Sequence, residues 1–257
     1  MTNRILIALL GLLVLAAESA AAPADLSSAV NTAGRQRMLS QRIAKAYCQI
    51  ALGVMVPESR RQLQDSVALF DAQLIELAPH VSGSDARSAT ADLARLWGPY
   101  RIRATGPVSR EGCAELTAAS DPLLAAANRL TILIEARANT TQAHLVNVSG
   151  RQRMVTQRLA KLYMLRATGY DSPQLRSDME SATALFSVSL AELQQAPENT
   201  PLIREQLDRV ALQWEWFRSA LEEDGEESYR ALVAEASESI LRDLEQVTSL
   251  YQGRAAE

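Results

Sequence analysis

The sequence has few of the residues that most catalytic and metal sites require. It contains two histidines, His80 and His144, which lie far apart, and none of the spacings HExxH, CxxC or GxSxG occurs. No glycine-rich loop that would hold a phosphate is present either. We therefore expect no catalytic residues, no metal ligands and no cofactor, and we do not expect an enzyme.

Aromatic residues are also scarce, at 5% of the chain, and long alternating runs of β-branched residues are missing. Such runs mark β-strands, whereas the residues that dominate here, alanine, leucine, glutamate, glutamine and arginine, favour helices. The sequence thus predicts an all-α protein with its aromatic residues in helical cores, namely Trp97, Tyr100, Trp214, Trp216 and Phe217. A net charge of −4 argues against nucleic acid as a partner.

The N-terminal residues are typical of a secretory signal peptide. Arg4 precedes the apolar run ILIALLGLLVLAA, and small residues follow it at the place where cleavage would occur. The run is too short for a comfortable membrane span, and no later stretch is apolar enough to cross a bilayer. We expect residues 1–21 to be removed, leaving a soluble periplasmic protein without a membrane span.

The most informative feature is an internal repeat. The segment 31–53 returns at 147–169 with thirteen of its twenty-three positions identical, and the likeness continues without gaps to residues 192–193. A repeat of this length indicates a duplicated domain. Proline and glycine, which are frequent at helix ends, divide each copy into four helices. The sequence predicts two antiparallel four-helix bundles, covering residues 22–138 and 139–257.

The connection between the two copies carries almost no helix-breaking residue. Between Pro122 and Gly169 there is no proline, and Gly150 is the one glycine. We therefore expect the last helix of the first bundle to continue into the first helix of the second, so that the bundles stack end to end around a long shared helix. Asp121 and Pro122 are expected to open the main part of that helix.

The repeated segment is strongly basic in an acidic chain. The stretch AGRQRMLSQRIAK (33–45) contains four cations, and no aspartate or glutamate occurs in 26–57 or in 136–170. On a helical wheel, nine positions that are identical in the second copy form one cationic half; they are Asn31, Gly34, Arg35, Arg37, Met38, Gln41, Arg42, Ala44 and Lys45. The opposite half varies conservatively, as a packed core does.

Cations at this density destabilise a helix unless negative charge lies nearby. Acidic residues of the next helix, such as Asp65, Asp71 or Glu76, are one source of that charge. A bound anion is the other, and arginine suits it because the planar guanidinium group donates two parallel hydrogen bonds to an oxyanion. The candidate ligand-binding residues are Gly34, Arg35, Arg37, Met38, Gln41 and Arg42, with their repeats Gly150, Arg151, Arg153, Met154, Gln157 and Arg158.

The strings NTAGRQRMLSQRIAK and NVSGRQRMVTQRLAK resemble the opening motif of the PilJ-type N-terminal domain of type IV pilus methyl-accepting chemotaxis transducers. That domain is related to the periplasmic nitrate-sensing domain of NarX-type histidine kinases. The resemblance covers almost the whole chain after residue 21. It implies four-helix bundles in which two first helices hold one nitrate through an arginine, which falls on Arg37 and Arg153. Gly34 and Gly150 match the neighbouring glycine, and the additional arginines, Arg35 and Arg151, are usual in the PilJ-like branch.

The resemblance implies a sensor-type protein that binds a small oxyanion such as nitrate or nitrite. Because the sequence shows no kinase, HAMP or methyl-accepting segment, we expect it to act through a partner, either a second copy in a homodimer or a membrane receptor. The alternative is a periplasmic adaptor that docks its cationic helices on an acidic protein and binds no small molecule. We also expect the two first helices to face each other, in a dimer or within one chain.

Cys48 and Cys113 are the two cysteines of the chain, and an even number in an exported protein favours one disulfide over two buried thiols. Cys48 lies about one turn before the end of the first predicted helix, and Cys113 lies just before the fourth. In an antiparallel bundle these two ends meet at the same pole. The bridge is therefore expected to close within the first bundle.

Overall fold

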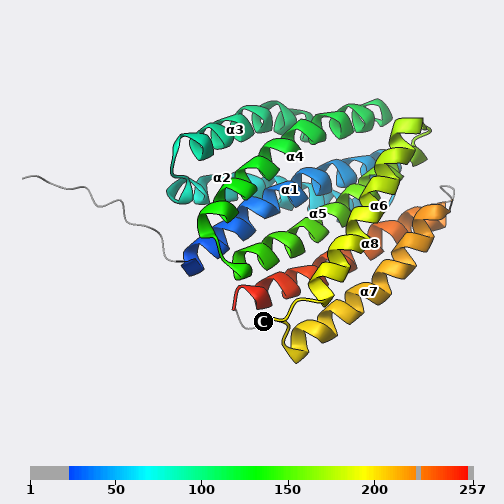
Figure 1. Cartoon of the computed structure of the whole chain (residues 1–257). Helices are drawn as coiled ribbons and strands as arrows, with labels where there is room; N and C mark the ends of the chain where they lie inside the picture. Colours follow the sequence, from blue (N-terminus) through cyan, green and yellow to red (C-terminus); the bar gives the residue numbers. More distant parts are fainter. Residues whose placement is uncertain (1–22, 224–226, 254–257) are drawn as a thin grey trace, which may run out of the picture.

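The computed structural model describes residues 23–223 and 227–253, so the predicted signal peptide, residues 1–21, lies outside the described residues. Within them the chain forms α-helices and a single 3-10 turn, Ala78–His80, and no β-strand (Figure 1). The prediction of an all-α fold is confirmed. None of the described helices is both long enough and apolar enough to cross a membrane.

The described helices form two sets of four, one from each sequence repeat. The first set is α1 (Pro23–Ala51), α2 (Val56–Glu76), α3 (Ser84–Ala104) and α4 (Arg110–Ala138). The second set is α5 (Thr141–Ala167), α6 (Pro173–Gln194), α7 (Pro201–Glu222) and α8 (Glu227–Tyr251).

Several of these helices begin at an N-cap residue. The hydroxyls of Ser109, Ser172 and Thr200 each accept a hydrogen bond from a backbone amide three residues later. α4 therefore begins at its Ser109 cap, well before the predicted start at Asp121 and Pro122, and Pro122 lies inside the helix.

The predicted shared helix between the bundles is wrong. α4 ends at Asn139, which adopts a left-handed conformation with φ 47°, and Thr140 then caps α5 by accepting a hydrogen bond from the Ala143 amide. Asparagine tolerates the left-handed region and threonine is a good N-cap, so the chain reverses without glycine or proline. The end-to-end stacking that a continuous helix would impose is therefore also wrong.

The two bundles instead pack side by side, with α1 and α5 in contact at the centre of the molecule (Figure 1). These two helices run in the same direction. Along α8, Gln252 contacts Asn31 of α1, while Ser237 accepts hydrogen bonds from Lys45 of α1 and from Gln157 of α5. The expectation that the two first helices face each other within one chain is confirmed.

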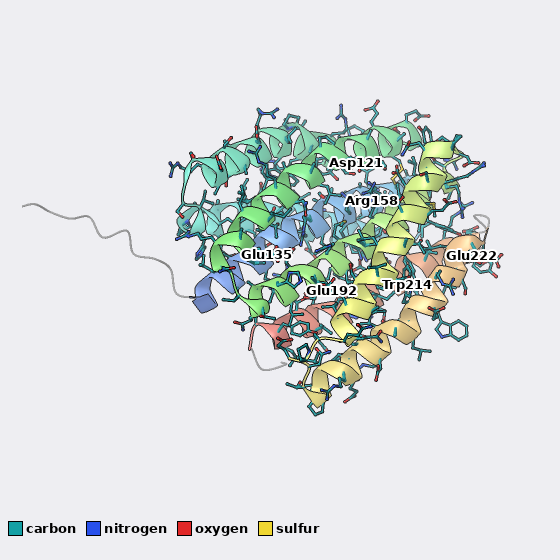
Figure 2. The ribbon with its side chains drawn as sticks, in the orientation of Figure 1. Asp121, Glu135, Arg158, Glu192, Trp214 and Glu222 are labelled. Atoms are coloured by element: carbon teal, nitrogen blue, oxygen red, sulfur yellow. A yellow bond between two sulfur atoms is a disulfide. The ribbon has the colours of Figure 1, made fainter. Side chains whose placement is uncertain are left out.

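Each bundle has an aromatic stack in its core, at equivalent positions of the repeat. Phe70 stacks on Trp97 with ring centroids 3.8 Å apart, and Phe186 stacks on Trp214 at 4.0 Å (Trp214 is labelled in Figure 2). Trp216 does not share this position, because its side chain is 73% exposed. Residues two apart lie on different faces of a helix, so the prediction of a core position for Trp216 is wrong.

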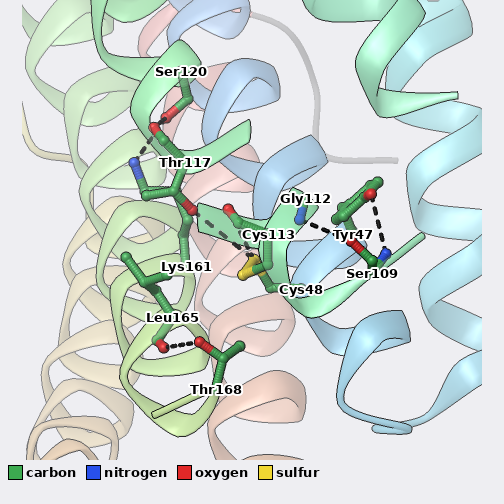
Figure 3. Close-up of a disulfide and its surroundings, with 10 residues drawn as sticks. All are labelled: Tyr47, Cys48, Ser109, Gly112, Cys113, Thr117, Ser120, Lys161, Leu165 and Thr168. Atoms are coloured by element: carbon green, nitrogen blue, oxygen red, sulfur yellow. Dashed lines mark hydrogen bonds between the residues drawn. A yellow bond between two sulfur atoms is a disulfide. The ribbon is translucent and has the colours of Figure 1, made fainter. Parts of the chain in front are cut away.

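The Cys48–Cys113 disulfide is present and closes within the first bundle, as predicted (Figure 3). Both cysteines are fully buried. Cys113 lies in the first turn of α4, beside the end of α1. Tyr47 supports the same pole, because its hydroxyl donates to the Pro107 carbonyl and accepts from the Ser109 amide. The bridge therefore fixes the end of α1 to the start of α4.

Candidate functional site

The repeated basic segment lies on α1 and α5, at the interface between the two bundles. Because these helices are parallel, equivalent residues of the two copies lie at the same level, related by an approximate two-fold axis along the helices. The predicted ligand-binding residues therefore all lie at this interface or beside it. The cationic half of α1 is buried there, with Arg37 1% exposed and Lys45 fully buried.

Arg37 reaches from α1 across to α5 and α4. Its Nη2 donates to Oδ1 of Asn147 at 2.7 Å and to the backbone carbonyl of the same residue at 3.3 Å. Its Nη1 donates to Oδ1 of Asn128 on α4 at 2.9 Å. All of these acceptors are neutral, and in the described part of the chain no carboxylate forms an ion pair with Arg37. This guanidinium group is buried without a direct counter-charge.

Arg153 makes the equivalent contact from α5 but has a different partner. Its Nη2 donates to Oδ1 of Asn31 at 2.6 Å, which mirrors the contact from Arg37 to Asn147. Its Nη1, however, lies 3.3 Å from a carboxylate oxygen of Glu245 on α8. Arg35 lies 3.4 Å from the same oxygen. Two arginines on this side of the interface thus share one carboxylate.

The two repeated glycines leave room for these guanidinium groups. A methyl group added at Gly34 would lie 3.1 Å from Nη2 of Arg37. A methyl group at Gly150 would lie 3.2 Å from Nη2 of Arg153 and 3.6 Å from Nη2 of Arg37. Both guanidinium groups therefore approach the same point beside Gly150, and a side chain at that position would crowd Arg153 and contact Arg37.

The centre of the interface carries more positive than negative charge. Burial lowers the pKa of Arg37 to about 9, and the charges of Arg151 and Arg153 lower it as well, against the opposing effect of Glu135. Burial also lowers the pKa of Arg153 to about 10, and Arg35 contributes in the same direction while Glu245 opposes it. The local field therefore favours an additional negative group near Arg37.

Glu135 reaches Arg37 only through an intermediate side chain. Asn147 donates from Nδ2 to Glu135 at 2.5 Å and accepts from Arg37 through its oxygen. The imidazole of His144 lies 3.0 Å from the other oxygen of Glu135 and 2.9 Å from Glu192. Partial burial alone would lower the pKa of His144, but its hydrogen bonds to Glu192 and Glu135 raise it. One oxygen of Glu135 thus contacts a surface histidine, and the other contacts Asn147 at the interface.

The next turn of α1 is neutralised by a buried ion-pair cluster. Glu238 on α8 contacts Nζ of Lys45 at 2.6 Å and Nη2 of Arg42 at 2.5 Å. Burial alone would raise the pKa of Glu238, but Lys45 and Arg42 lower it to about 2. The carboxylate therefore stays ionised, and Arg42 is fully engaged by residues of the protein itself.

In the equivalent turn of α5, the lysine is paired in the same way with the first bundle, whereas the arginine is paired within its own bundle. Nζ of Lys161 donates to Ser120 at 2.8 Å and lies 3.4 Å from Asp121 on α4, while Arg158 lies 3.7 Å from Asp178 on α6. Burial lowers the pKa of Lys161 to about 8, with Asp121 opposing the shift. Each copy of the motif thus places its lysine against the last helix of the other copy.

The remaining predicted residues serve packing in this structure. Met38 and Met154 are buried beside the arginines, and Gln41 and Gln157 are fully buried. Gln157 donates to the backbone carbonyl of Ser237 at 3.0 Å. The side-chain oxygens of both glutamines accept no hydrogen bond within the described residues. These amides border the interface without forming part of the arginine cluster.

The carboxylates that pair with the cations of α1 and α5 lie on other helices than the sequence predicts. The acids on the second predicted helix are engaged elsewhere: Asp71 accepts from Trp97 and Arg101, and Glu76 accepts from Thr32. Apart from Asp178 on α6, the neutralising carboxylates belong to α4 and α8, the last helices of the two copies; they are Asp121, Glu135, Glu238 and Glu245. This follows because α4 packs on α1 and α5, while α8 packs on α5 and is reached from α1 by Arg42 and Lys45.

Sequence reasoning missed the polar residues that hold the guanidinium groups. Asn31 and Asn147 belong to the repeated motif, so the repeat itself signals them. Asn128 and Glu245 lie on helices where the repeat has diverged, and no local pattern marks them. Their role depends on the packing of α4 and α8 against the central pair.

A groove on the surface leads to Arg37. It has a volume of about 690 Å³ and lies between α4, α5 and α6, on the side of the molecule where Asp121 and Arg158 are labelled in Figure 2. Its polar lining comprises three arginines, three amides and two carboxylates; they are Arg37, Arg151, Arg158, Asn128, Asn147, Gln174, Asp121 and Asp178. Its apolar lining is Leu124, Ala125, Ile132, Met154 and Leu185. In the described part of the chain, no group of three or more histidine, cysteine, aspartate or glutamate side chains is arranged to hold a metal.

Comparisons with known proteins find one family in both halves of the chain. Residues 23–110 and 136–249 match the family of type IV pili methyl-accepting chemotaxis transducer N-terminal domains, PilJ. Methyl-accepting chemotaxis protein McpN of Pseudomonas aeruginosa is 32% identical over 121 residues, which cover 44% of this chain and 23% of McpN. The chain thus spans less than a quarter of the length of this relative. No solved structure matches the chain.

Proposed function

Since the chain belongs to the PilJ family of chemotaxis-transducer N-terminal domains, we propose that it is a periplasmic sensory protein that binds a small oxyanion, nitrate or nitrite in type, between α1 and α5. The bound state is read by a partner protein, because signalling needs a second component. A non-enzymatic role fits both the family and the site, where buried cations face neutral amides.

The observation that carries this proposal is the environment of Arg37. A buried guanidinium group with neutral hydrogen-bond partners and two neighbouring arginines has an unfavourable electrostatic energy. A monovalent oxyanion beside it supplies the missing charge and accepts charge-assisted hydrogen bonds. Gly34 and Gly150 keep side-chain atoms away from this place.

The arrangement of α1 and α5 supplies within one chain what the family resemblance implies for two subunits. Arg37 and Arg153 approach each other from equivalent positions of parallel helices. A second copy of the chain is therefore not needed to complete the site. We accordingly propose a receptor, and not a homodimer, as the partner. An anion that relieves the repulsion between the two arginines would draw α1 and α5 together, which is a structural change that a partner can recognise.

The alternative function, docking of the cationic helices on an acidic protein, has less support. Arg37, Lys45, Arg153 and Lys161 are each no more than 1% exposed, and they lie between helices of the same chain. A partner would have to separate the two bundles to reach them. Only the partly exposed Arg35, Arg42, Arg151 and Arg158 are accessible, and three of these already form ion pairs.

Isothermal titration of the mature protein with nitrate, nitrite, sulfate and chloride at matched ionic strength tests the proposal. Each charge-assisted hydrogen bond contributes about 1.5–3 kcal/mol, so Arg37→Gln is expected to weaken anion binding at least tenfold. Arg60→Gln, an exposed arginine on α2, is the matched control and should bind normally. Unchanged affinity in the Arg37→Ala, Arg153→Ala double variant would remove this site from consideration.

A further inference from the structure

The approximate two-fold symmetry of the interface is broken at one polar position. Across the axis, Lys45 contacts Ser237 and Glu238, while Lys161 contacts Ser120 and Asp121. These contacts align α4 with α8 and make Asn128 the equivalent of Glu245. Arg153 and Arg35 therefore contact a carboxylate, whereas the equivalent Arg37 contacts a neutral amide.

The side with Glu245 shows which chemical group these arginines bind. One carboxylate oxygen of Glu245 lies 3.3 Å from Nη1 of Arg153 and 3.4 Å from Nε of Arg35. On the opposite side the neutral amide of Asn128 takes the corresponding place, and no carboxylate of the described residues forms an ion pair with Arg37 or Arg151. Asn128 accepts from Arg37 through its oxygen, which leaves its amide nitrogen to donate to a ligand.

The groove beside Arg37 differs from its symmetry equivalent in a second way. Its volume of about 690 Å³ is far larger than a three-oxygen anion requires and lies within the usual range for small organic ligands. Its wall on α4 contains Ala125 and Ile132, where the equivalent positions on α8 carry Arg242 and Ser249. The wall is thus more apolar than its equivalent at these two positions, whereas Leu124, Met154 and Leu185 have the apolar equivalents Leu241, Met38 and Leu69 on the other side.

We propose that the groove between α4, α5 and α6 binds a small monocarboxylate with a short apolar tail. The carboxylate of the ligand lies beside Asn128, near Arg37 and Arg151, and supplies the negative charge that Glu245 supplies on the other side of the axis. The tail lies along Leu124, Ile132 and Met154. The inference rests on the proposed function, since it specifies the anion that the interface recognises.

Titration with a chain-length series tests this inference. A buried methylene group contributes about 0.8 kcal/mol, so butyrate is expected to bind about tenfold more tightly than acetate in a partly open groove. Nitrate serves as the anion without a tail. Equal affinities for acetate and butyrate, or binding of nitrate alone, would overturn the inference and leave the proposed oxyanion function standing. Absence of binding by every anion would overturn both.

Two variants locate the site. Asn128→Glu supplies on α4 the carboxylate that Glu245 supplies on α8, so it should abolish carboxylate binding and raise the melting temperature. Gln246→Glu adds the same group at an exposed position of α8 and should bind butyrate as the unmodified protein does. Ile132→Ser, at a half-exposed position of the groove wall, introduces the neutral residue of the equivalent position on α8 and should retain acetate binding and lose the preference for butyrate. Normal butyrate binding by Asn128→Glu or by Ile132→Ser would refute the placement.

Discussion

Replacing Arg37 with methionine is expected to stabilise the ligand-free protein and to abolish anion binding. Arg37 is buried at the interface of α1 and α5, and its hydrogen-bond acceptors are the neutral side chains of Asn128 and Asn147 and backbone carbonyls. A charged group in such a place has lost its hydration without gaining a carboxylate partner. Methionine has a similar length and flexibility and carries no charge, so it fills the same space.

The magnitude follows from the altered pKa of the guanidinium group. Its decrease from 12.5 to about 9 corresponds to roughly 5 kcal/mol of disfavoured charge, at about 1.4 kcal/mol for each pKa unit. The replacement also leaves the oxygens of Asn128 and Asn147 without a donor, at a cost of about 1–3 kcal/mol for a buried acceptor and toward the lower end for the partly buried Asn128. We expect a net stabilisation of about 2 kcal/mol, which is in the range found when buried charges are replaced by apolar side chains.

Urea unfolding followed by far-ultraviolet circular dichroism, at pH 7 in low salt, measures this difference. The midpoint should rise while the denaturant slope stays constant, because the surface exposed on unfolding does not change. Arg153→Met is the matched comparison and should gain less, since it also removes the contact with Glu245. A loss of more than 1 kcal/mol in Arg37→Met at constant slope would refute the reasoning, because it would show that the neutral partners compensate the charge.

Two further predictions concern other buried groups. Reduction of the Cys48–Cys113 disulfide opens a loop of 65 residues and should cost about 4 kcal/mol in the chain-entropy description, visible as a lower urea midpoint with reductant; an unchanged midpoint would contradict it. Lys161 has its pKa lowered to about 8 from 10.5, so the unfolded chain binds more protons between these values and stability should rise with pH across that range. The free energy of unfolding of the unmodified protein should therefore rise by about 3 kcal/mol from this group between pH 7.5 and 10.5, and Lys161→Met should lack this increase. An equal pH dependence of the two proteins would contradict the lowered pKa of Lys161.

The parts of the fold that could be predicted have local causes in the sequence. Helix content follows from composition, and the duplication follows from direct self-alignment. The disulfide follows from the positions of Cys48 and Cys113 in a bundle with antiparallel helices. The break between α4 and α5 was missed because Asn139 and Thr140 reverse the chain with side chains that a helix also tolerates.

The residues of the candidate site also fall into those with a local signal in the sequence and those without one. The arginines and glycines could be predicted because the repeat preserves them against a varied background. Their partners could not, because Asn128 and Glu245 act through the packing of α4 and α8 on the central helices. The sequence shows that the cationic half of α1 needs negative charge, and only the structure shows which half of the interface lacks it.

Duplication within one chain permits an arrangement that a symmetric pair of subunits does not. In a homodimer, both symmetry-related positions would carry the same residue, either asparagine twice or glutamate twice. Here Asn128 and Glu245 differ, so one half of the interface contains a carboxylate and the other contains a neutral amide. The covalent link keeps α1 and α5 in one chain, so binding of the proposed anion would not spend energy on subunit association. An anion that binds off the axis, as we propose, would change one bundle differently from the other and give a partner an asymmetric surface to recognise.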